Sequence, residues 1–270
     1  MKNDFTDNRF DILLQAGQSN AEGLGYGPVD RPFEPSDDIL YFESKKILNM
    51  NGIGYDETKN EEFFIVRAKE HDFPGYADLT GCGNFALFFA AKYIENGLLE
   101  KGKKLLIIRS AVGGTGFGDR RWGLQDDLYL NMIQMLNAAL VLNPENKLKA
   151  FLWHQGENDC FSSDYETHKK NLSKLIGSVR EKFCAYLPFI SGNFTAKWQE
   201  ENDKFCKPII QAMRDVCRET ENSAFVETDG LLSNIEMNGG ENVVHFCKQA
   251  LYELGERYYE AYTGIRRRSL

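Results

Sequence analysis

Short apolar runs, each followed by a polar or glycine-rich cluster and then by a segment of helical periodicity, constrain the fold of this chain more than any other feature. The three clearest runs lie at 10–14, 104–108 and 148–153. This order is typical of strand–loop–helix units around a parallel sheet. Weaker runs at 186–190 and 224–227 bring the expected sheet to about five strands. Two other runs, at 39–42 and 63–66, are candidates for further strands.

The segments between the runs carry apolar residues at helical spacing. The clearest helix is expected at 127–142, and four more are expected at 84–96, 165–183, 207–219 and 247–262. No repeat, low-complexity tract or linker divides the chain, so we expect one domain over 1–270 of the α/β class. The segment 23–81 is rich in Gly, Pro and Asp without a clear helix, which predicts a long loop insertion near the site.

Charge and cysteine usage exclude several classes of protein. The 270 residues contain 32 Lys and Arg against 40 Asp and Glu, which gives a formal charge of -8. A surface of that sign repels phosphate backbones and anionic lipids, so we expect neither a nucleic acid nor a membrane as partner. The N-terminus has no apolar signal region, which predicts a cytoplasmic location. The six cysteines form no CxxC pair, and we expect free thiols.

Polar clusters end the three clearest runs, and in an open parallel sheet the carboxyl ends of the strands are where ligands gather. Ser19 follows the first run directly, with Gly17 two residues before it, so it is either an exposed nucleophile or the cap of a helix. Gly113 and Gly114 follow the second run. They either bring backbone N–H groups to a developing oxyanion or form a tight turn without a ligand.

The third cluster, at 154–159, reads His-Gln-Gly-Glu-Asn-Asp, which is unusually polar for the end of a buried strand. Metal binding is disfavoured because the cluster has one histidine and follows a strand, whereas HExxH needs two histidines on a helix. A mechanism based on serine needs a base, and His154 and His245 are the choices. His71 and His168 lie in charged surroundings and are expected to be solvated.

Together these segments resemble the SGNH hydrolase superfamily, and more closely its carbohydrate acetylesterase branch, which includes acetylxylan esterases and sialate O-acetylesterases. Four blocks occur in the family order between about residues 10 and 262. The segment 17–20 resembles the nucleophile block. The segment 113–115, followed by Trp122-Gly123, resembles the glycine block. The segment 153–159 is similar to the W-x-Q-G-E-x-D block. The histidine block is matched by His245-Phe246 and the helix that follows.

The resemblance implies a three-layer α/β/α fold with a flavodoxin-like sheet and a serine esterase that needs no cofactor and no metal. Ser19 would attack the acetyl carbonyl, and His245 would take its proton and return it to the sugar alkoxide. The tetrahedral oxyanion would be stabilised by the backbone N–H groups of Ser19 and of Gly113 or Gly114, together with the side-chain amide of Gln155.

One position departs from the family pattern. Where the family commonly has Asp three residues before its histidine, this chain has Asn242, which cannot carry the charge that stabilises an imidazolium. Glu157 is the first candidate to replace that charge, and Glu241 is the second. Alternatively, Glu157 only ties loops together by hydrogen bonds.

Several residues near the blocks are candidates for binding the substrate: Gln18 and Asn20 beside the serine, Trp122 and Tyr129 for stacking on a sugar face, and Arg121 for an acidic sugar such as a sialate. The aromatic residues are equally compatible with the core, and Arg120 and Arg121 with solvated surface charge. The expected reaction is removal of O-acetyl groups from a small or oligomeric carbohydrate: a xylan-derived sugar, a sialate or a related glycan. The alternatives are a catalytically impaired carbohydrate-binding protein on the same fold and an esterase for a non-carbohydrate ester.

Overall fold

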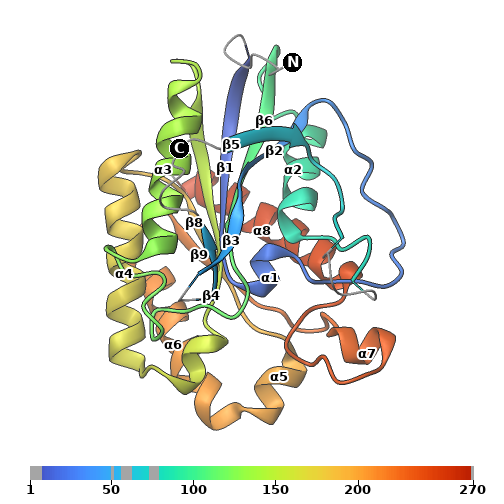
Figure 1. Ribbon diagram of the computed structural model, residues 1–270, viewed down its shortest axis with the longest axis vertical. Helices are drawn as coiled ribbons and strands as arrows, with labels where there is room; N and C mark the ends of the chain where they lie inside the picture. Colours follow the sequence, from blue (N-terminus) through green and yellow to red (C-terminus); the bar gives the residue numbers. More distant parts are fainter. Residues whose placement is uncertain (1–7, 50–51, 56–62, 73–78, 269–270) are drawn as a thin grey trace.

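The central sheet has seven strands in the order β5-β2-β6-β1-β7-β8-β9 (Figure 1). The computed structural model describes residues 8–49, 52–55, 63–72 and 79–268. The sheet strands are β1 (Arg9–Gly17), β2 (Ile39–Ser44), β5 (Phe63–Arg67), β6 (Lys103–Ala111), β7 (Lys147–His154), β8 (Phe189–Gly192) and β9 (Ser223–Val226). All neighbouring pairs are parallel except that of β2 with β5. Strands β3 (Lys46–Asn49) and β4 (Gly52–Tyr55) form a separate hairpin pair.

The parallel α/β prediction is confirmed, but the expected count of about five strands is corrected to seven. The five expected strands are β6, β1, β7, β8 and β9, and in chain order they follow the flavodoxin-like sequence 2-1-3-4-5. The two extra strands are the apolar runs at 39–42 and 63–66, which form β2 and β5 and extend one edge of the sheet. The segment predicted as a loop insertion therefore contributes strands as well as loops.

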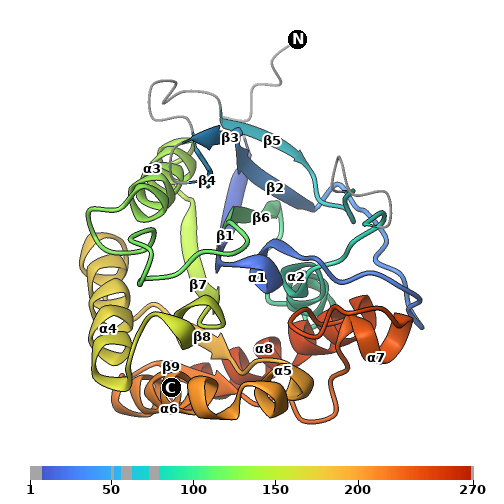
Figure 2. The ribbon, with the colours of Figure 1, turned by 60° about the horizontal axis from the view of Figure 1, so that its bottom comes forward.

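Helices cover both faces of the sheet, which gives the three layers. The helices are α1 (Ser19–Glu22), α2 (Phe85–Glu95), α3 (Asp127–Val141), α4 (Tyr165–Lys182), α5 (Ala196–Glu201), α6 (Asp203–Glu219), α7 (Asn234–Asn238) and α8 (Lys248–Arg268), with a 3-10 turn at Asn158–Phe161. The predicted helices are all present, and the last extends to residue 268. Helices α3, α4 and α6 pack on one face, and α2 and α8 on the other (Figures 1 and 2).

Alternation along the strands divides the core between the two faces. In β1, Ile12 and Leu14 face the layer of α3, α4 and α6, while Leu13 faces the layer of α2 and α8. Successive side chains of a strand point to opposite faces, so a strand that is apolar throughout requires cover on both sides. The six cysteines carry free thiols, as predicted. No helix of the described residues has the length and apolar character needed to cross a membrane.

Candidate active site

Strands β1, β6 and β7 end at the same level, which brings the three polar clusters of the sequence to one edge of the sheet. In the strand register, Gly17 lies opposite Ala111 of β6 and His154 of β7. Gly17 has a φ of 132°, and a Cβ at this position would lie 2.0 Å from the carbonyl oxygen of His154. Only glycine fits both the dihedral angle and the close approach, so the strand can turn sharply before Ser19.

Ser19 is the first residue of α1 and is buried at this turn. The N-cap is Gln18, and the Ser19 hydroxyl forms no hydrogen bond among the described residues. The alternative that Ser19 merely caps a helix is therefore not supported. A Cβ built on Gly113 would lie 3.4 Å from the Cβ of Ser19, so the serine faces the glycine block directly.

His245 lies on the loop between α7 and α8, whose backbone is fixed on both sides. The Asn234 N–H donates to the His245 carbonyl oxygen at 2.8 Å, and the His245 N–H donates to the Asn242 side-chain oxygen at 3.3 Å. Asn242 therefore holds the backbone of His245 and does not contact its ring. Nδ1 of the ring is buried and has no hydrogen-bond partner in the described structure. Burial lowers the pKa of His245, while the carboxylates of Glu157 and Glu22 oppose that effect.

Glu157 is a buried carboxylate between the nucleophile block and the histidine block. Its Oε1 accepts a 2.7 Å hydrogen bond from Asn20 Nδ2 and lies 3.5 Å from His154 Nε2, while Oε2 is buried without a partner. Burial alone would raise the pKa of Glu157. The His154 ring, a backbone N–H and the Asn20 amide outweigh burial and hold this pKa below its usual range. The site therefore contains an ionised carboxylate.

No hydrogen bond or ion pair of the described structure joins Glu157 to His245. The two groups nevertheless interact, because Glu157 is the strongest charge acting on the His245 ring. Glu241, the second candidate acid, is exposed, and its carboxylate forms no hydrogen bond or ion pair with the described residues. Of the two candidates, Glu157 is the carboxylate that the fold places near the histidine.

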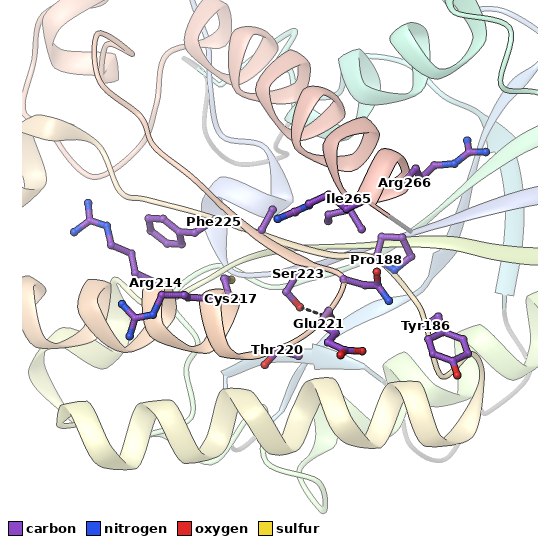
Figure 3. A pocket seen from close by; sticks show the side chains of 14 residues that line it. Tyr186, Pro188, Arg214, Cys217, Thr220, Glu221, Ser223, Phe225, Ile265 and Arg266 are labelled. Carbon is purple, nitrogen blue, oxygen red and sulfur yellow. Dashed lines mark hydrogen bonds between the residues drawn. The ribbon is translucent and has the colours of Figure 1, made fainter. Parts of the chain in front are cut away.

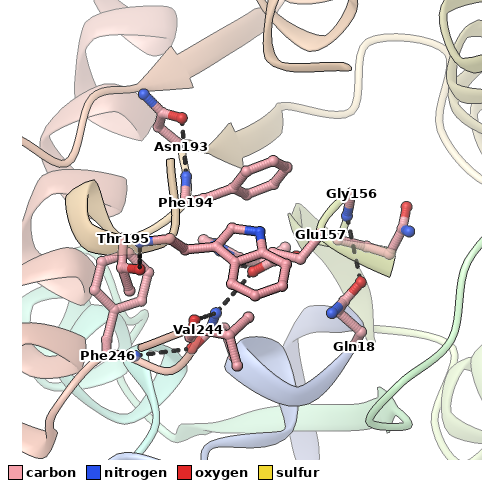
Figure 4. Close-up of polar contacts among 12 residues, drawn as sticks. Gln18, Gly156, Glu157, Asn193, Phe194, Thr195, Val244 and Phe246 are labelled. Carbon is pink, nitrogen blue, oxygen red and sulfur yellow. Dashed lines mark hydrogen bonds and ion pairs between the residues drawn. The ribbon is translucent and has the colours of Figure 1, made fainter. Parts of the chain in front are cut away.

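Two predicted substrate-binding side chains, Asn20 and Gln18, instead tie the site loops together. Figure 4 shows Gln18 bonded to the backbone of Gly156. Asn20 is fully buried: its amide donates to Glu157 and to the Val244 carbonyl oxygen, and its oxygen accepts the Phe246 N–H at 3.1 Å. Gln18 Oε1 accepts from the N–H groups of Gly156 and Asn158, at 3.5 and 3.2 Å. Because both side chains are buried and paired within the protein, their prediction as substrate contacts is not supported.

The other three predicted substrate contacts are also buried and paired within the protein, and the structure gives them no support. Trp122 is fully buried and donates from Nε1 to Thr115 Oγ1 at 3.0 Å. Tyr129 is buried and its hydroxyl contacts Ser178. Arg121 is also buried, and its guanidinium binds both oxygens of Asp127, at 2.9 and 3.0 Å, and a backbone carbonyl. These side chains anchor the start of α3 in the core.

The predicted oxyanion donors are only partly available in this structure. The Gly113 N–H donates at 2.8 Å to Oε2 of Glu22, which lies one turn after the serine. The amide of Gln155 donates to the Thr115 carbonyl oxygen at 3.3 Å and to Asp159 at 3.1 Å. Gln155 is thus oriented by the loops around it, and a direct role at the oxyanion is not supported. Glu22 was not singled out in the sequence, where the only signal was its spacing of three residues from Ser19.

Asp159 is the hydrogen-bonding centre of the cluster that follows β7. It accepts the N–H groups of Phe117 and Gly118, at 3.1 and 2.9 Å, as well as the Gln155 amide. The ring of His168 lies 3.1 Å from the same carboxylate and is fully buried, so the expectation that His168 is solvated is wrong. Burial would raise the pKa of Asp159, but the hydrogen bonds from His168 and the two backbone groups hold it below its usual range.

We expect Asp159→Asn to lower the free energy of unfolding by about 3 kcal/mol at pH 7, because it removes the charged partner of a buried pair. A lowered carboxyl pKa contributes stability that is complete above the usual value of 3.8 and is lost as the pH falls below it. The difference between parent and variant should therefore shrink in acid. Urea unfolding at several pH values measures it, with the exposed Asp229→Asn as the matched control. An equal difference at all pH values would contradict this account.

Two cavities flank the fold, at opposite edges of the sheet. One of about 920 Å³ is lined by residues that include Glu22 and Ala111, beside the serine. The other, of about 1090 Å³, lies where β8 and β9 begin, and its lining includes Pro188, Ser223 and Ile265 (Figure 3). Since the chemistry-bearing residues lie at the carboxyl ends of the strands, only the first cavity adjoins them. Among the described residues, no three metal-ligating side chains gather.

The fold and these groups define the class: an α/β/α protein with a serine, a histidine and an ionised carboxylate at the carboxyl edge of a parallel sheet. A sequence profile of the family described as carbohydrate esterase, sialic acid-specific acetylesterase matches residues 9–264. The chain belongs to this family, whose members are carboxylic-ester hydrolases. The resemblance to the carbohydrate acetylesterase branch is confirmed.

Individual relatives agree with this assignment. Over 89 residues the chain is 32% identical to a probable 9-O-acetyl-N-acetylneuraminic acid deacetylase of Escherichia coli (strain K12), a match that spans 30% of this chain and 27% of that protein. The crystal structure of NanS superposes with a TM-score of 0.76 at 21% identity, covering 97% of this chain and 98% of the other.

A protein from Arabidopsis thaliana superposes with a TM-score of 0.68 at 19% identity, over 94% of this chain and 98% of that one. A carbohydrate acetylesterase from Xanthomonas citri gives 0.58 at 15% identity, over 94% of this chain and 56% of that one. At these identities the superpositions show the shared fold.

Proposed function

We propose that this protein is a serine esterase that removes O-acetyl groups from sialic acids. The observation that carries the proposal is that Gly113 faces Ser19, while the neighbouring Asn20 binds Glu157 and the backbone on either side of His245. The family assignment, and the deacetylase name of the Escherichia coli relative, support acetylated sialic acid as the substrate. The acidic charge of the chain disfavours a nucleic acid as partner, and we propose that the protein acts in the cytoplasm as a single domain.

In the proposed reaction, Ser19 Oγ attacks the acetyl carbonyl carbon while the His245 ring takes the hydroxyl proton. The tetrahedral intermediate collapses by breaking the bond from carbon to the sugar oxygen, and His245 returns the proton to that oxygen. Water then attacks the acetyl-serine by the same route and releases acetate. Backbone N–H groups at Ser19 and the glycine pair stabilise the oxyanion, once the Glu22 carboxylate has left the Gly113 N–H.

Glu157 acts on this reaction through its charge. Proton transfer to His245 creates an imidazolium in a buried site, where a cation without a nearby anion is costly. The ionised Glu157 carboxylate stabilises that cation across the gap between the two side chains. Because Asn20 and His154 hold Glu157 in place, the charge is already positioned before the reaction begins.

A second candidate function is sugar binding without hydrolysis. It is favoured by the unpartnered Nδ1 of His245 and by Asn242, whose side chain contacts the backbone of the histidine only. A third candidate is an esterase for a non-carbohydrate ester.

Acetate release separates these candidates. We expect hydrolysis of 9-O-acetyl-N-acetylneuraminate with a kcat/KM at least about tenfold above that for acetylated xylose or p-nitrophenyl acetate. That ratio is about 1.4 kcal/mol of preferential transition-state binding. Binding of the acetylated sugar with no release of acetate from any substrate would favour the second candidate. Hydrolysis of p-nitrophenyl acetate alone would favour the third.

The pH dependence of kcat/KM should report the pKa of His245. Burial lowers this pKa from its usual value of 6.5, so the ring is neutral and competent as a base at pH 7. We expect activity to be flat near neutrality and to fall in acid with a midpoint below 6.5, measured with p-nitrophenyl acetate between pH 4.5 and 8. An acid limb above pH 7 would contradict the assignment of a buried base.

A further inference from the structure

The cavity of about 920 Å³ adjoins the end of α1, the short helix that begins with Ser19, and neither Ser19 nor His245 is among the residues that line it. Its lining includes Glu22, one turn after Ser19 in α1, and Ala111, the last residue of β6, which comes two residues before Gly113. A bound molecule that fills the cavity thus has the glycine block within reach. Strands β2 and β5, which come from the segment 23–81, form much of its wall, and Figure 2 shows β5 at the edge of the sheet, next to β2.

The floor of this cavity is a fixed cation. The guanidinium of Arg109 lies over the ring of Tyr41, 4.7 Å from its centroid, and donates to Glu43 at 2.6 Å and to the Glu22 carbonyl oxygen at 3.0 Å. His71 Nε2 lies 3.3 Å from the same group, so His71 is half-buried and paired and is not simply solvated as expected. Because these contacts pair the Arg109 guanidinium within the protein, they hold it in place at the floor of the cavity.

The rim of the cavity carries further cations and two exposed apolar side chains. Lys45 and Lys69 are exposed and form no ion pair or hydrogen bond with any described residue. Phe64 and Val66 of β5 are 43% and 41% exposed, and they offer an apolar surface of the kind that packs against a sugar ring. Arg67 also lines the rim, where it pairs with an aspartate.

The carboxylates of the cavity are engaged by groups other than these lysines. Glu43 is paired with Arg109, Glu22 accepts the Gly113 N–H, and Asp72 accepts the Gly81 N–H. In a chain whose net charge is -8, two lysines without a partner among the described residues form a local site for an anion at the mouth of this cavity. A sialic acid differs from most sugars in carrying a carboxylate, which is the group that such lysines would select.

We propose that this cavity holds the sugar ring and that Lys45 and Lys69 bind the carboxylate of the acetylated sialic acid. The inference rests on the proposed function and adds the determinant that distinguishes an acidic sugar from a neutral one. Each lysine contributes a solvent-exposed charge contact, so the two together favour the acid by about threefold to tenfold.

The test compares O-acetyl-N-acetylneuraminate with its C1 carboxamide, which has the same sugar and acetyl group but no charge. We expect the parent protein to have a kcat/KM about threefold to tenfold higher for the acid, and we expect this preference to shrink between 20 and 500 mM salt. Lys45→Ala with Lys69→Ala should bring the ratio close to one, while Lys69→Arg should retain it. Lys174→Ala, an exposed lysine on α4, is the matched control and should keep the parent ratio.

The ratio of kcat/KM for the acid to kcat/KM for the carboxamide is taken within each variant. Differences between variants in the folded fraction or in the chemical step therefore cancel. Equal rates on acid and carboxamide in the parent, or an unchanged preference in the double variant, would overturn the proposal. If the protein hydrolyses p-nitrophenyl acetate but neither sugar, the substrate of the proposed function is wrong. Calorimetric binding of N-acetylneuraminate and its carboxamide then decides the subsite separately: tighter binding of the acid that is lost in the double variant supports it, and equal or absent binding refutes it.

Discussion

Ser19→Ala should abolish ester hydrolysis, with a loss of at least about three orders of magnitude in kcat, because no other group at the site can form the acyl-enzyme. The substitution removes a hydroxyl that makes no hydrogen bond within the described structure, so the thermal unfolding midpoint should hardly change. The measurement is acetate release from p-nitrophenyl acetate and from the acetylated sugar. Ser173→Ala, at an exposed position on α4, is the matched control.

His245→Ala should be comparably severe, and the double variant should be no worse than either single one, since nucleophile and base act as a unit. His154→Ala should affect activity less directly, because its ring contacts Glu157 and the Tyr258 hydroxyl rather than the serine. Activity of Ser19→Ala within a few fold of the parent would refute the proposed mechanism. If the His154 variant loses more activity than the His245 variant while both remain folded, then His154 and not His245 is the base.

Glu157→Gln should keep the shape of the site, remove its charge and lower kcat by about two orders of magnitude. A direct acid–histidine contact is worth about four orders in the serine-protease case, and here no hydrogen bond joins the two residues. Because the Glu157 charge raises the pKa of His245, its removal should also move the acid limb of the pH profile further into acid. Glu241→Gln, at an exposed carboxylate nearby, is the control and should change neither quantity.

Asn242→Asp provides the complementary measurement. The Asn242 oxygen accepts the His245 backbone N–H, and an aspartate can accept the same bond without reaching the ring. We therefore expect little change in kcat. A strong gain in Asn242→Asp together with an unaffected Glu157→Gln would show that the site lacks a competent acid and that Glu157 serves only to connect loops.

The sheet could be predicted because its signals are local. Apolar runs followed by glycine or polar clusters mark where strands end, and parallel strands bring those ends to one edge whatever the intervening loops do. Ser19, Gly113, Glu157 and His245 therefore came from the sequence. The extra strands β2 and β5 were harder to predict, because short apolar runs within a segment rich in turn residues are ambiguous between strand and loop.

The roles of the side chains around the site depend on partners far away in the chain. In the sequence alone, Arg121 is compatible with a ligand contact or with surface charge, and Trp122 with a ligand contact or with the core. Contacts with Asp127 and Thr115 show that both side chains are buried. His168 sits in a charged sequence, yet a helix turn directs it onto Asp159. The signal available for His168 was its place in the first turn of α4, where one side chain in three or four points inward.

The contact between Glu22 and Gly113 has a consequence for turnover. In the proposed mechanism the Gly113 N–H is an oxyanion donor, so the Glu22 carboxylate that it binds in this structure holds the position expected for the carboxylate of released acetate. An incoming ester would replace that internal anion with a neutral carbonyl, and once acetate forms, two carboxylates would compete for one donor. Like charges at such short range repel, which would favour departure of the freed acid. Under this proposal, Glu22 both covers the donor before the reaction and helps to release the product afterwards.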